Sequence, residues 1–260
     1  VTVTDSGGNT DTQTITVTVT NVDDVNPVIT SNSGGSTASI SFAENNTAAV
    51  TTVTSTDADN LSGTTYSHSG TDAGDFSINS SSGVLTFAST PNYESPADDG
   101  PNNEYIVIVT VTDSGGNTDT QTITVTVTDV NEFTPVITSN GGGSTGSISF
   151  AENSTSAVTT VTSSDVDAGA TAAYSISGTD AGDFNINSSS GALTFKSVPN
   201  FEIPDDDGTN NGYIVIVTVT DSGNNTDTQT LTITVTDVNE APVITSNGGG
   251  STGSISFAEN

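Results

Sequence analysis

Alternation of β-branched apolar residues with threonine dominates the sequence. The segments YIVIVTVTD (Tyr105–Asp113) and TITVTVTD (Thr122–Asp129) both follow this pattern. A period of two places successive side chains on opposite faces of a strand, so both segments predict half-buried β-strands. Between them, the segment DSGGNTD (Asp113–Asp119) is rich in glycine, asparagine and aspartate, which favour turns. The whole stretch predicts a β-hairpin.

Five shorter runs of the same kind precede this hairpin. They are SISFAEN (Ser39–Asn45), AVTTVTS (Ala49–Ser55), TTYSHS (Thr64–Ser69), DFSIN (Asp75–Asn79) and GVLTF (Gly83–Phe87). Helical periodicity is absent, and seven short strands at this spacing predict an all-β, antiparallel Greek-key sandwich. The residues we expect in its core are Phe42, Val50, Phe76, Ile78, Leu85, Phe87, Ile108, Ile123 and Val125.

The pattern repeats along the chain. The phrase DSGGNTDTQTITVTVT starts at Asp5 and again at Asp113, and a variant starts at Asp221, so the period is 108 residues. A period of this length is a whole domain, too long for a solenoid unit. We therefore expect an excerpt from a tandem array: the end of one repeat (1–27), two complete repeats (28–135 and 136–242) and the start of another (243–260).

Charge is strongly one-sided. The 260 residues contain 31 Asp and Glu against a single Lys or Arg, which gives a formal net charge of −30. Such a chain repels nucleic acids and anionic membranes and attracts cations. Two like charges about 4 Å apart repel by roughly 4 kcal/mol at an effective dielectric of 20, so clustered carboxylates without a metal are costly. There is no cysteine, hence no disulfide and no thiolate metal site.

Acidic motifs recur at the edges of the repeats in a fixed order. The chain shows AEN, then TDAD or SDVD, then NYE or NFE, then VTVTDSG, and finally the connector DVNEFTP. In this order and at this period, the motifs resemble those of the cadherin repeat, in particular the cadherin-like domains of very large bacterial surface proteins. The resemblance covers the whole chain.

The resemblance implies that each connector binds calcium through residues of the repeats before and after it. Hard oxygen donors in this number suit Ca²⁺ better than Mg²⁺. At the central connector, the implied ligands are Glu44, Glu94, Val130, Asn131, Glu132, Phe133, Asp165, Asp167 and Asp221, with Val130 and Phe133 contributing carbonyls. At the outer connectors they are Asp23, Asp24, Asp57, Asp59 and Asp113 on one side, and Glu152, Glu202, Asn239 and Glu240 on the other.

Two departures from the family pattern affect the ion count. Asn92 and Asn200 stand where the family motif has an aspartate, and the connectors carry NE in place of ND. We expect at least two ions at the central connector and leave a third open. For the acidic loops Pro96–Gly100 and Pro204–Asn211, the sequence leaves two interpretations, a further ion site or a solvated turn.

Catalysis has little support in the sequence. His68 is the only histidine and Lys196 the only basic residue, so nucleophiles and oxyanion stabilisers are few. We expect no enzyme. Near-identical repetition favours a calcium-rigidified extender of an extracellular, cell-surface adhesin or filament. The alternative is a calcium-dependent homophilic adhesion or fibre-forming module. The expected partners are neighbouring repeats or like chains, and neither nucleic acid nor membrane.

Overall fold

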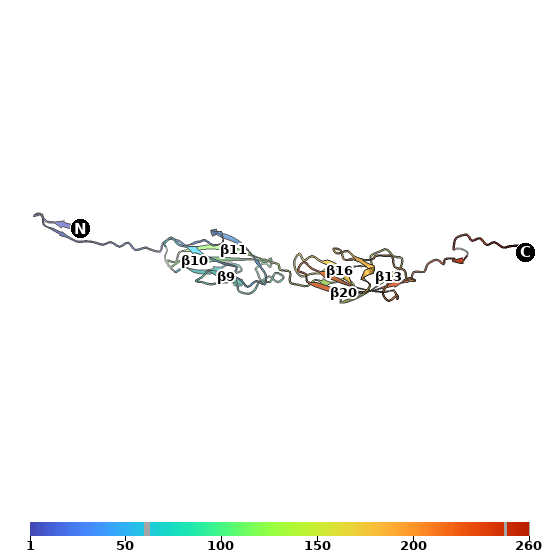
Figure 1. The fold of residues 1–260 in the computed structure, drawn as a ribbon. Helices are drawn as coiled ribbons and strands as arrows, with labels where there is room; N and C mark the ends of the chain where they lie inside the picture. Colours follow the sequence, from blue (N-terminus) through green and yellow to red (C-terminus); the bar gives the residue numbers. More distant parts are fainter. Residues whose placement is uncertain (60–62, 247–248, 260) are drawn as a thin grey trace. The chain divides into compact units, whose positions relative to one another are not determined.

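The computed structural model describes residues 1–59, 63–246 and 249–259, and strands provide nearly all of its regular structure (Figure 1). The chain divides into two compact units, Val1–Val130 and Asn131–Asn260. Each unit contains one β-sandwich. Within the described ranges, no helix has the length and apolar character needed to cross a membrane.

The first sandwich has two layers. One is a four-stranded sheet in the order β4 (Thr37–Ala43), β11 (Thr118–Thr128), β10 (Glu104–Thr112) and β7 (Thr65–Ser69). The other combines the pair β3 (Val28–Ile29) and β6 (Ser55–Thr56) with the sheet β5 (Thr51–Thr52), β9 (Val84–Phe87) and β8 (Phe76–Ile78). Two 3₁₀ turns, η1 (Asn32–Gly34) and η2 (Ala73–Asp75), lie in its loops, and a small hairpin, β1 (Thr2–Thr4) and β2 (Thr10–Thr12), precedes it.

The second sandwich repeats this topology. Its four-stranded sheet runs β13 (Thr145–Ala151), β20 (Thr226–Thr236), β19 (Gly212–Thr220) and β16 (Ala173–Ser177). The other layer contains β12 (Val136–Ile137) with β15 (Ser163–Ser164), and β14 (Thr159–Thr160), β18 (Ala192–Phe195) and β17 (Phe184–Ile186). The 3₁₀ turn η3 (Ala181–Asp183) precedes β17.

Alternation along β10 and β11 builds the core, as the period-two pattern predicts. Every second residue, such as Val107, Val109 and Val125, is fully buried. Aromatic rings join the two layers: the Phe87 and Tyr105 ring centroids are 5.1 Å apart in an edge-to-face arrangement. Of the residues predicted for the core, Ile78 and Phe87 are partly buried against it, Ile108 is not part of it, and the other six are buried. The prediction missed about as many buried residues as it found, among them Val107 and Val109. In the all-apolar run of β10, Val107 and Val109 take the inward face, so Ile108 points outward beside Thr122.

Strand details differ from the prediction in two ways. The expected strand 49–55 is interrupted, because β5 pairs with β9 while β6 pairs with β3. One ladder is parallel, the pair β4–β11, because the chain leaves β3 in one layer and enters β4 in the other. The same holds for β13–β20. This parallel pairing places the ends of both strands at the same edge of the sandwich.

Candidate metal centres

Acidic side chains gather in four clusters, and each cluster lies within one unit. In each cluster, one oxygen from every member lies within 4.8 Å of those of the others. The first unit holds the first aspartate cluster (Asp23, Asp57, Asp59) and the first glutamate cluster (Glu44, Glu94, Asp129). The second unit holds the second aspartate cluster (Asp165, Asp167, Asp221) and the second glutamate cluster (Glu152, Glu202, Asp237, Glu240).

Parallel strand pairing creates the glutamate clusters. In the first sandwich, Ala43 and Thr128 are register partners at the ends of β4 and β11, so Glu44 and Asp129 emerge side by side. Glu44 is 2% exposed. Its carboxylate accepts hydrogen bonds from the backbone N–H groups of Tyr93 (2.7 Å) and Val130 (2.8 Å). These bonds hold the loop that carries Glu94 against the strand ends.

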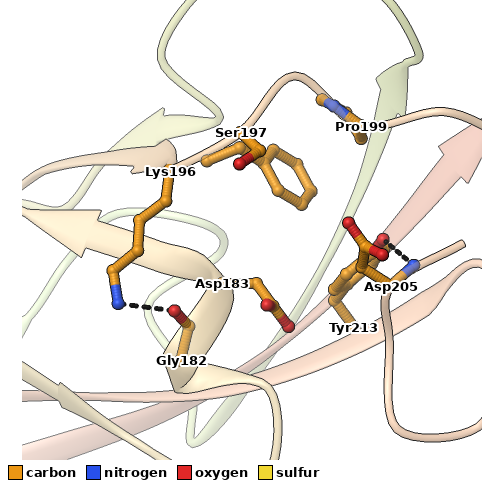
Figure 2. A pocket seen from close by; sticks show the side chains of 8 residues that line it. Gly182, Asp183, Lys196, Ser197, Pro199, Asp205 and Tyr213 are labelled. Carbon is orange, nitrogen blue, oxygen red and sulfur yellow. Dashed lines mark hydrogen bonds between the residues drawn. The ribbon is translucent and has the colours of Figure 1, made fainter.

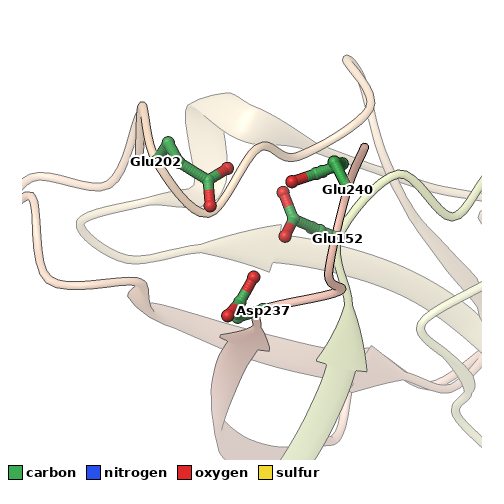
Figure 3. Close-up of side chains that lie close together, drawn as sticks. All are labelled: Glu152, Glu202, Asp237 and Glu240. Atoms are coloured by element: carbon green, nitrogen blue, oxygen red, sulfur yellow. The ribbon is translucent and has the colours of Figure 1, made fainter. Parts of the chain in front are cut away.

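The second glutamate cluster is built in the same way, and its four carboxylates turn toward a common space (Figure 3). Glu152 accepts the N–H groups of Phe201 and Val238, each at 2.8 Å, and these bonds lower its pKa. A backbone hydrogen bond to the Glu202 carboxylate by itself lowers the pKa of Glu202. Desolvation and repulsion from Glu152, Glu240 and Asp237 outweigh that bond, so the pKa of Glu202 is raised. Repulsion of this kind is what a bound cation relieves.

Turns build the second aspartate cluster. Asp165 and Asp167 follow β15, and the Asp167 N–H donates to Asp165 Oδ1 at 3.1 Å. Asp221 follows β19, and its two carboxylate oxygens accept the backbone and side-chain N–H groups of Asn225 at 2.7 and 2.9 Å. The aspartate that leads the recurring phrase is therefore held by its own turn at the cluster.

Connector residues bind to this cluster from the chain segment just before the second sandwich. The Phe133 N–H donates to Asp167 Oδ2 at 2.8 Å. The Asn131 side chain donates to Ser222 Oγ at 3.0 Å and accepts from Asn225 Nδ2 at 3.1 Å. Both connector positions thus lie at the aspartate cluster through contacts within the second unit.

The first aspartate cluster has the same design. Asp59 Oδ2 accepts the N–H groups of Asp24 (3.0 Å) and Val25 (2.8 Å), which precede the first sandwich. Asp24 contributes this backbone contact and lies outside the carboxylate cluster, as does Asp113. Burial works to raise the pKa of Asp113, but hydrogen bonds from Asn117, Gly116 and Gly115 outweigh it, and the pKa is lowered.

The clusters fit a hard divalent cation. In the part of the chain that the structure describes, three clusters contain buried carboxylate oxygens that accept no hydrogen bond: Asp23 Oδ1, Asp57 Oδ2, Asp129 Oδ1 and Asp165 Oδ2. A buried oxygen without a donor is costly unless a cation or water satisfies it. With one basic residue in the whole sequence, salt bridges supply almost no positive charge. Oxygen-only donor sets of this size are the ligands that Ca²⁺ prefers.

Comparison with known families decides what these sandwiches are. The model of the cadherin domain matches residues 38–128 and again residues 146–236. The chain belongs to the cadherin family. No curated protein sequence gives a significant match.

Solved structures of cadherin domains share the fold. Domains 3–6 of protocadherin gamma B2 align with a TM-score of 0.70 at 19% identity, over 85% of this chain and 55% of that one. Drosophila N-cadherin domains 1–4 align with a TM-score of 0.63 at 21% identity, over 82% of this chain and 50% of that one. Mouse cadherin-23 domains 22–24 align with a TM-score of 0.60 at 23% identity, over 84% of this chain and 67% of that one. The chain spans about half the length of the first two structures, and at these identities the likeness concerns the fold.

Sequence reasoning missed Asp129 and Asp237, the first residues of the two DVNE motifs. Each stands directly after a long strand, beside the glutamate of an AEN motif on the parallel neighbour. The parallel register was the signal that could have identified them. Asn92, which replaces a cadherin-motif aspartate, points its Oδ1 at the Ser95 N–H (2.7 Å), and Asn200 does the same with Ile203 (2.8 Å).

The remaining predicted ligands lie on the connectors. Val130 donates its N–H to Glu44, and Glu132 and Asn239 are exposed and lie outside the clusters. Their assignment as calcium ligands stays a prediction.

The acidic loops are organised by their own carboxylates. Asp206, 3% exposed, accepts the N–H groups of Gly208, Asn210 and Asn211, and Asp98 accepts those of Asn102 and Asn103. Neither residue belongs to one of the four clusters. These bonds hold each loop in shape. His68 Nε2 lies 3.1 Å from the carbonyls of both Ala73 and Phe76, a position suited to holding η2 in place.

Proposed function

We propose that this chain is a calcium-rigidified extender segment of an extracellular adhesin or surface filament, in which Ca²⁺ at the connectors stiffens a row of cadherin domains. The observation that carries the proposal is the placement of the clusters. In each sandwich, an aspartate cluster contacts the connector that enters, and a glutamate cluster lies where the next connector leaves. Such a domain presents cation ligands at both of its junctions.

A short stretch of chain links a residue of one cluster to a residue that contacts another. Asp129 belongs to the first glutamate cluster, and Phe133 donates to Asp167 of the second aspartate cluster. Four peptide units separate Asp129 from Phe133, a span of at most about 15 Å when fully extended. Ions bound to both clusters would join the two sandwiches, and repulsion between six or more carboxylates would separate them when the ions are removed.

Repetition supports an extender over a site-specific binder. The hairpin phrase is identical at Asp5–Thr20 and Asp113–Thr128, so added repeats add length with little new chemistry. Calcium affinity is expected near that of extracellular modules, on the order of 10⁻⁴ to 10⁻³ M. In this reading the chain has no enzymatic role, and its partners are its neighbouring repeats.

Small-angle scattering with calcium and with chelator tests the proposal. The expected result is a longer maximum dimension and lower flexibility in millimolar calcium, at an unchanged monomer mass by light scattering. Identical scattering curves under both conditions would refute calcium-dependent stiffening. Calcium-dependent growth in mass would favour homophilic or fibre-forming association instead of a passive extender.

A further inference from the structure

The second sandwich contains a pocket that has no part in the calcium clusters. The loop pocket has a volume of about 150 Å³ and lies between η3, the loop that follows β18, and β19 (Figure 2). The lining residues that carry the argument are Asp183, Phe195, Lys196, Pro199, Asp205 and Tyr213. The first sandwich has a counterpart of about 90 Å³, with Asp75, Phe87, Pro91, Ala97 and Tyr105 at the matching positions. The pocket is thus a feature of the repeat.

Two aromatic side chains and a half-buried carboxylate line the pocket. The Phe195 and Tyr213 ring centroids are 5.1 Å apart at 85°, which leaves an aromatic wall. The Asp183 carboxylate turns toward the hollow (Figure 2). Burial raises its pKa, and repulsion from Asp180 and Asp205 adds to the rise, while Lys196 lowers it. A carboxylate in this state gains from a cation that enters the pocket.

Differences between the two repeats concentrate in the loop that contributes part of the pocket lining. Five of the ten residues from 196 to 205 differ from their counterparts at 88 to 97, whereas only four of the 25 in the β19–β20 hairpin differ from β10–β11. Relative to the first sandwich, the pocket lining gains Lys196 for Ala88 and Asp205 for Ala97. In the same loop but outside the lining, Val198 replaces Thr90 and Ile203 replaces Ser95. Val198 is 50% exposed and Ile203 71% exposed.

Each of these changes alters what the loop offers to a ligand. Asp205 donates its N–H to the Tyr213 hydroxyl at 3.2 Å, which keeps a second carboxylate at the mouth (Figure 2). Lys196 donates to the Gly182 carbonyl and so lies against η3 at one side of the pocket. Val198 and Ile203 add exposed apolar surface to the same loop, outside the pocket lining.

We propose that the loop pocket of the second sandwich binds a basic side chain, best an arginine, of an extended segment in a partner protein. The guanidinium stacks on the aromatic wall and pairs with Asp183 and Asp205. An apolar neighbour in the segment packs on Val198 and Ile203, exposed residues of the same loop outside the pocket lining. The volume is below the 300 Å³ or more of common small-molecule sites and suits one side chain. The counterpart pocket has Ala97 in place of the second acid, so it binds more weakly.

Titration of the full chain in saturating calcium with N-acetyl-arginine methylamide tests this proposal. The matched probe is N-acetyl-citrulline methylamide, which has nearly the same shape and no charge. In NMR spectra, the arginine probe is expected to shift the resonances of Phe195, Tyr213 and Ile203, and the citrulline probe to shift them far less. Equal responses to both probes, or shifts spread over the acidic surface without preference for this pocket, would overturn the proposal.

Single substitutions sharpen the test, and two of them, Asp205→Ala and Lys196→Ala, introduce residues with which the first sandwich already folds. Asp205→Ala is expected to lower the affinity for the arginine probe about threefold, and Asp183→Asn about fivefold. These factors are in the range of partly exposed ion pairs. Lys196→Ala removes a competing cation and should tighten binding about twofold. Unchanged affinity in both aspartate variants would contradict the pocket. Calcium titration of the same variants is expected to match the wild type, so the outcome is independent of the calcium proposal.

Discussion

The second sandwich holds its two acidic clusters by different means. At the glutamate cluster, Glu152 is 2% exposed and caps two backbone N–H groups, and these bonds lower its pKa. At the aspartate cluster, short turns hold the side chains, and Asp165 keeps a buried oxygen that accepts no hydrogen bond from any described residue. The contrast predicts two roles: the Glu152 carboxylate holds backbone N–H groups in the fold itself, whereas the aspartate cluster keeps a buried oxygen that a cation would satisfy.

The largest effect is expected from Glu152→Ala. It leaves the Phe201 and Val238 N–H groups without their acceptor, and hydrogen bonds to a charged group contribute about 1.5–3 kcal/mol each. Because the two bonds share one carboxylate, we expect a loss of about 2–4 kcal/mol in the free energy of unfolding, even in chelator. Denaturant unfolding in EGTA measures it.

Glu152→Gln and Glu240→Ala are the controls. Glutamine retains one strong acceptor and should lose less stability than alanine, while the exposed Glu240 should change stability by no more than about 0.5 kcal/mol. If Glu152→Ala is as stable as wild type in chelator, the structural role of this carboxylate is wrong.

Calcium itself is expected to have the next largest effect. A ligand that binds only the folded state at 100 times its Kd adds about 2.7 kcal/mol, so the melting temperature should rise with calcium and follow the logarithm of its concentration. Magnesium should do much less, because its small octahedral shell dehydrates reluctantly. Equal stabilisation by both ions in calorimetry would point to general screening of the −30 charge.

A smaller effect, visible mainly in calcium, is expected from Asp167→Ala. It removes a member of the aspartate cluster that also accepts the Phe133 N–H of the connector. We expect calcium affinity at the central connector to fall about tenfold or more, the range seen when a metal site loses a supporting group. In chelator, the lost hydrogen bond is partly offset by relieved repulsion, so stability should change by about 1 kcal/mol or less.

Asp207→Ala is the matched control, since it removes one negative charge from an exposed loop of the same unit. Calorimetric titration of both variants separates site chemistry from net charge. An Asp167→Ala protein that keeps every high-affinity site would contradict the bridging assignment.

Much of this fold could be predicted because its physics is local. Alternation in β11 and in the second half of β10, together with the DSGGNTD turn, predicts the hairpin, and the 108-residue period predicts that the sandwich repeats. The role of Asp129 could not be predicted in this way, since it depends on the parallel β4–β11 register between segments far apart in sequence. The prediction that Ile108 lies in the core was wrong for a different reason: in an all-apolar run, the sequence does not say which face of the strand is buried. The loop pocket needed the structure, because its aromatic wall comes from β18 and β19.

The smallest expected effect is the pH dependence of Asp183→Asn. Burial raises the pKa of Asp183, so the folded state binds this proton more tightly than the unfolded state. Below the unfolded pKa of about 3.9 the carboxyl is protonated in both states and costs nothing. As pH rises through the folded pKa, ionisation destabilises the fold, and the cost persists to neutral pH. Asparagine does not ionise and avoids this cost. The free energy of unfolding of the variant should therefore rise by at most about 0.5 kcal/mol at pH 7, and this gain should vanish near pH 3.5.

Asp75→Asn offers an internal replicate, since burial and repulsion from Asp72 and Asp98 also raise the pKa of Asp75 in the first sandwich. Asp207→Asn removes the same charge from an exposed position and corrects for general repulsion in so acidic a chain. Unfolding free energies in chelator, measured from pH 3.5 to 7, give the comparison. If Asp183→Asn gains no more than Asp207→Asn at any pH, the pocket carboxylate is fully solvated, and the electrostatic basis for cation binding in the loop pocket is lost with it.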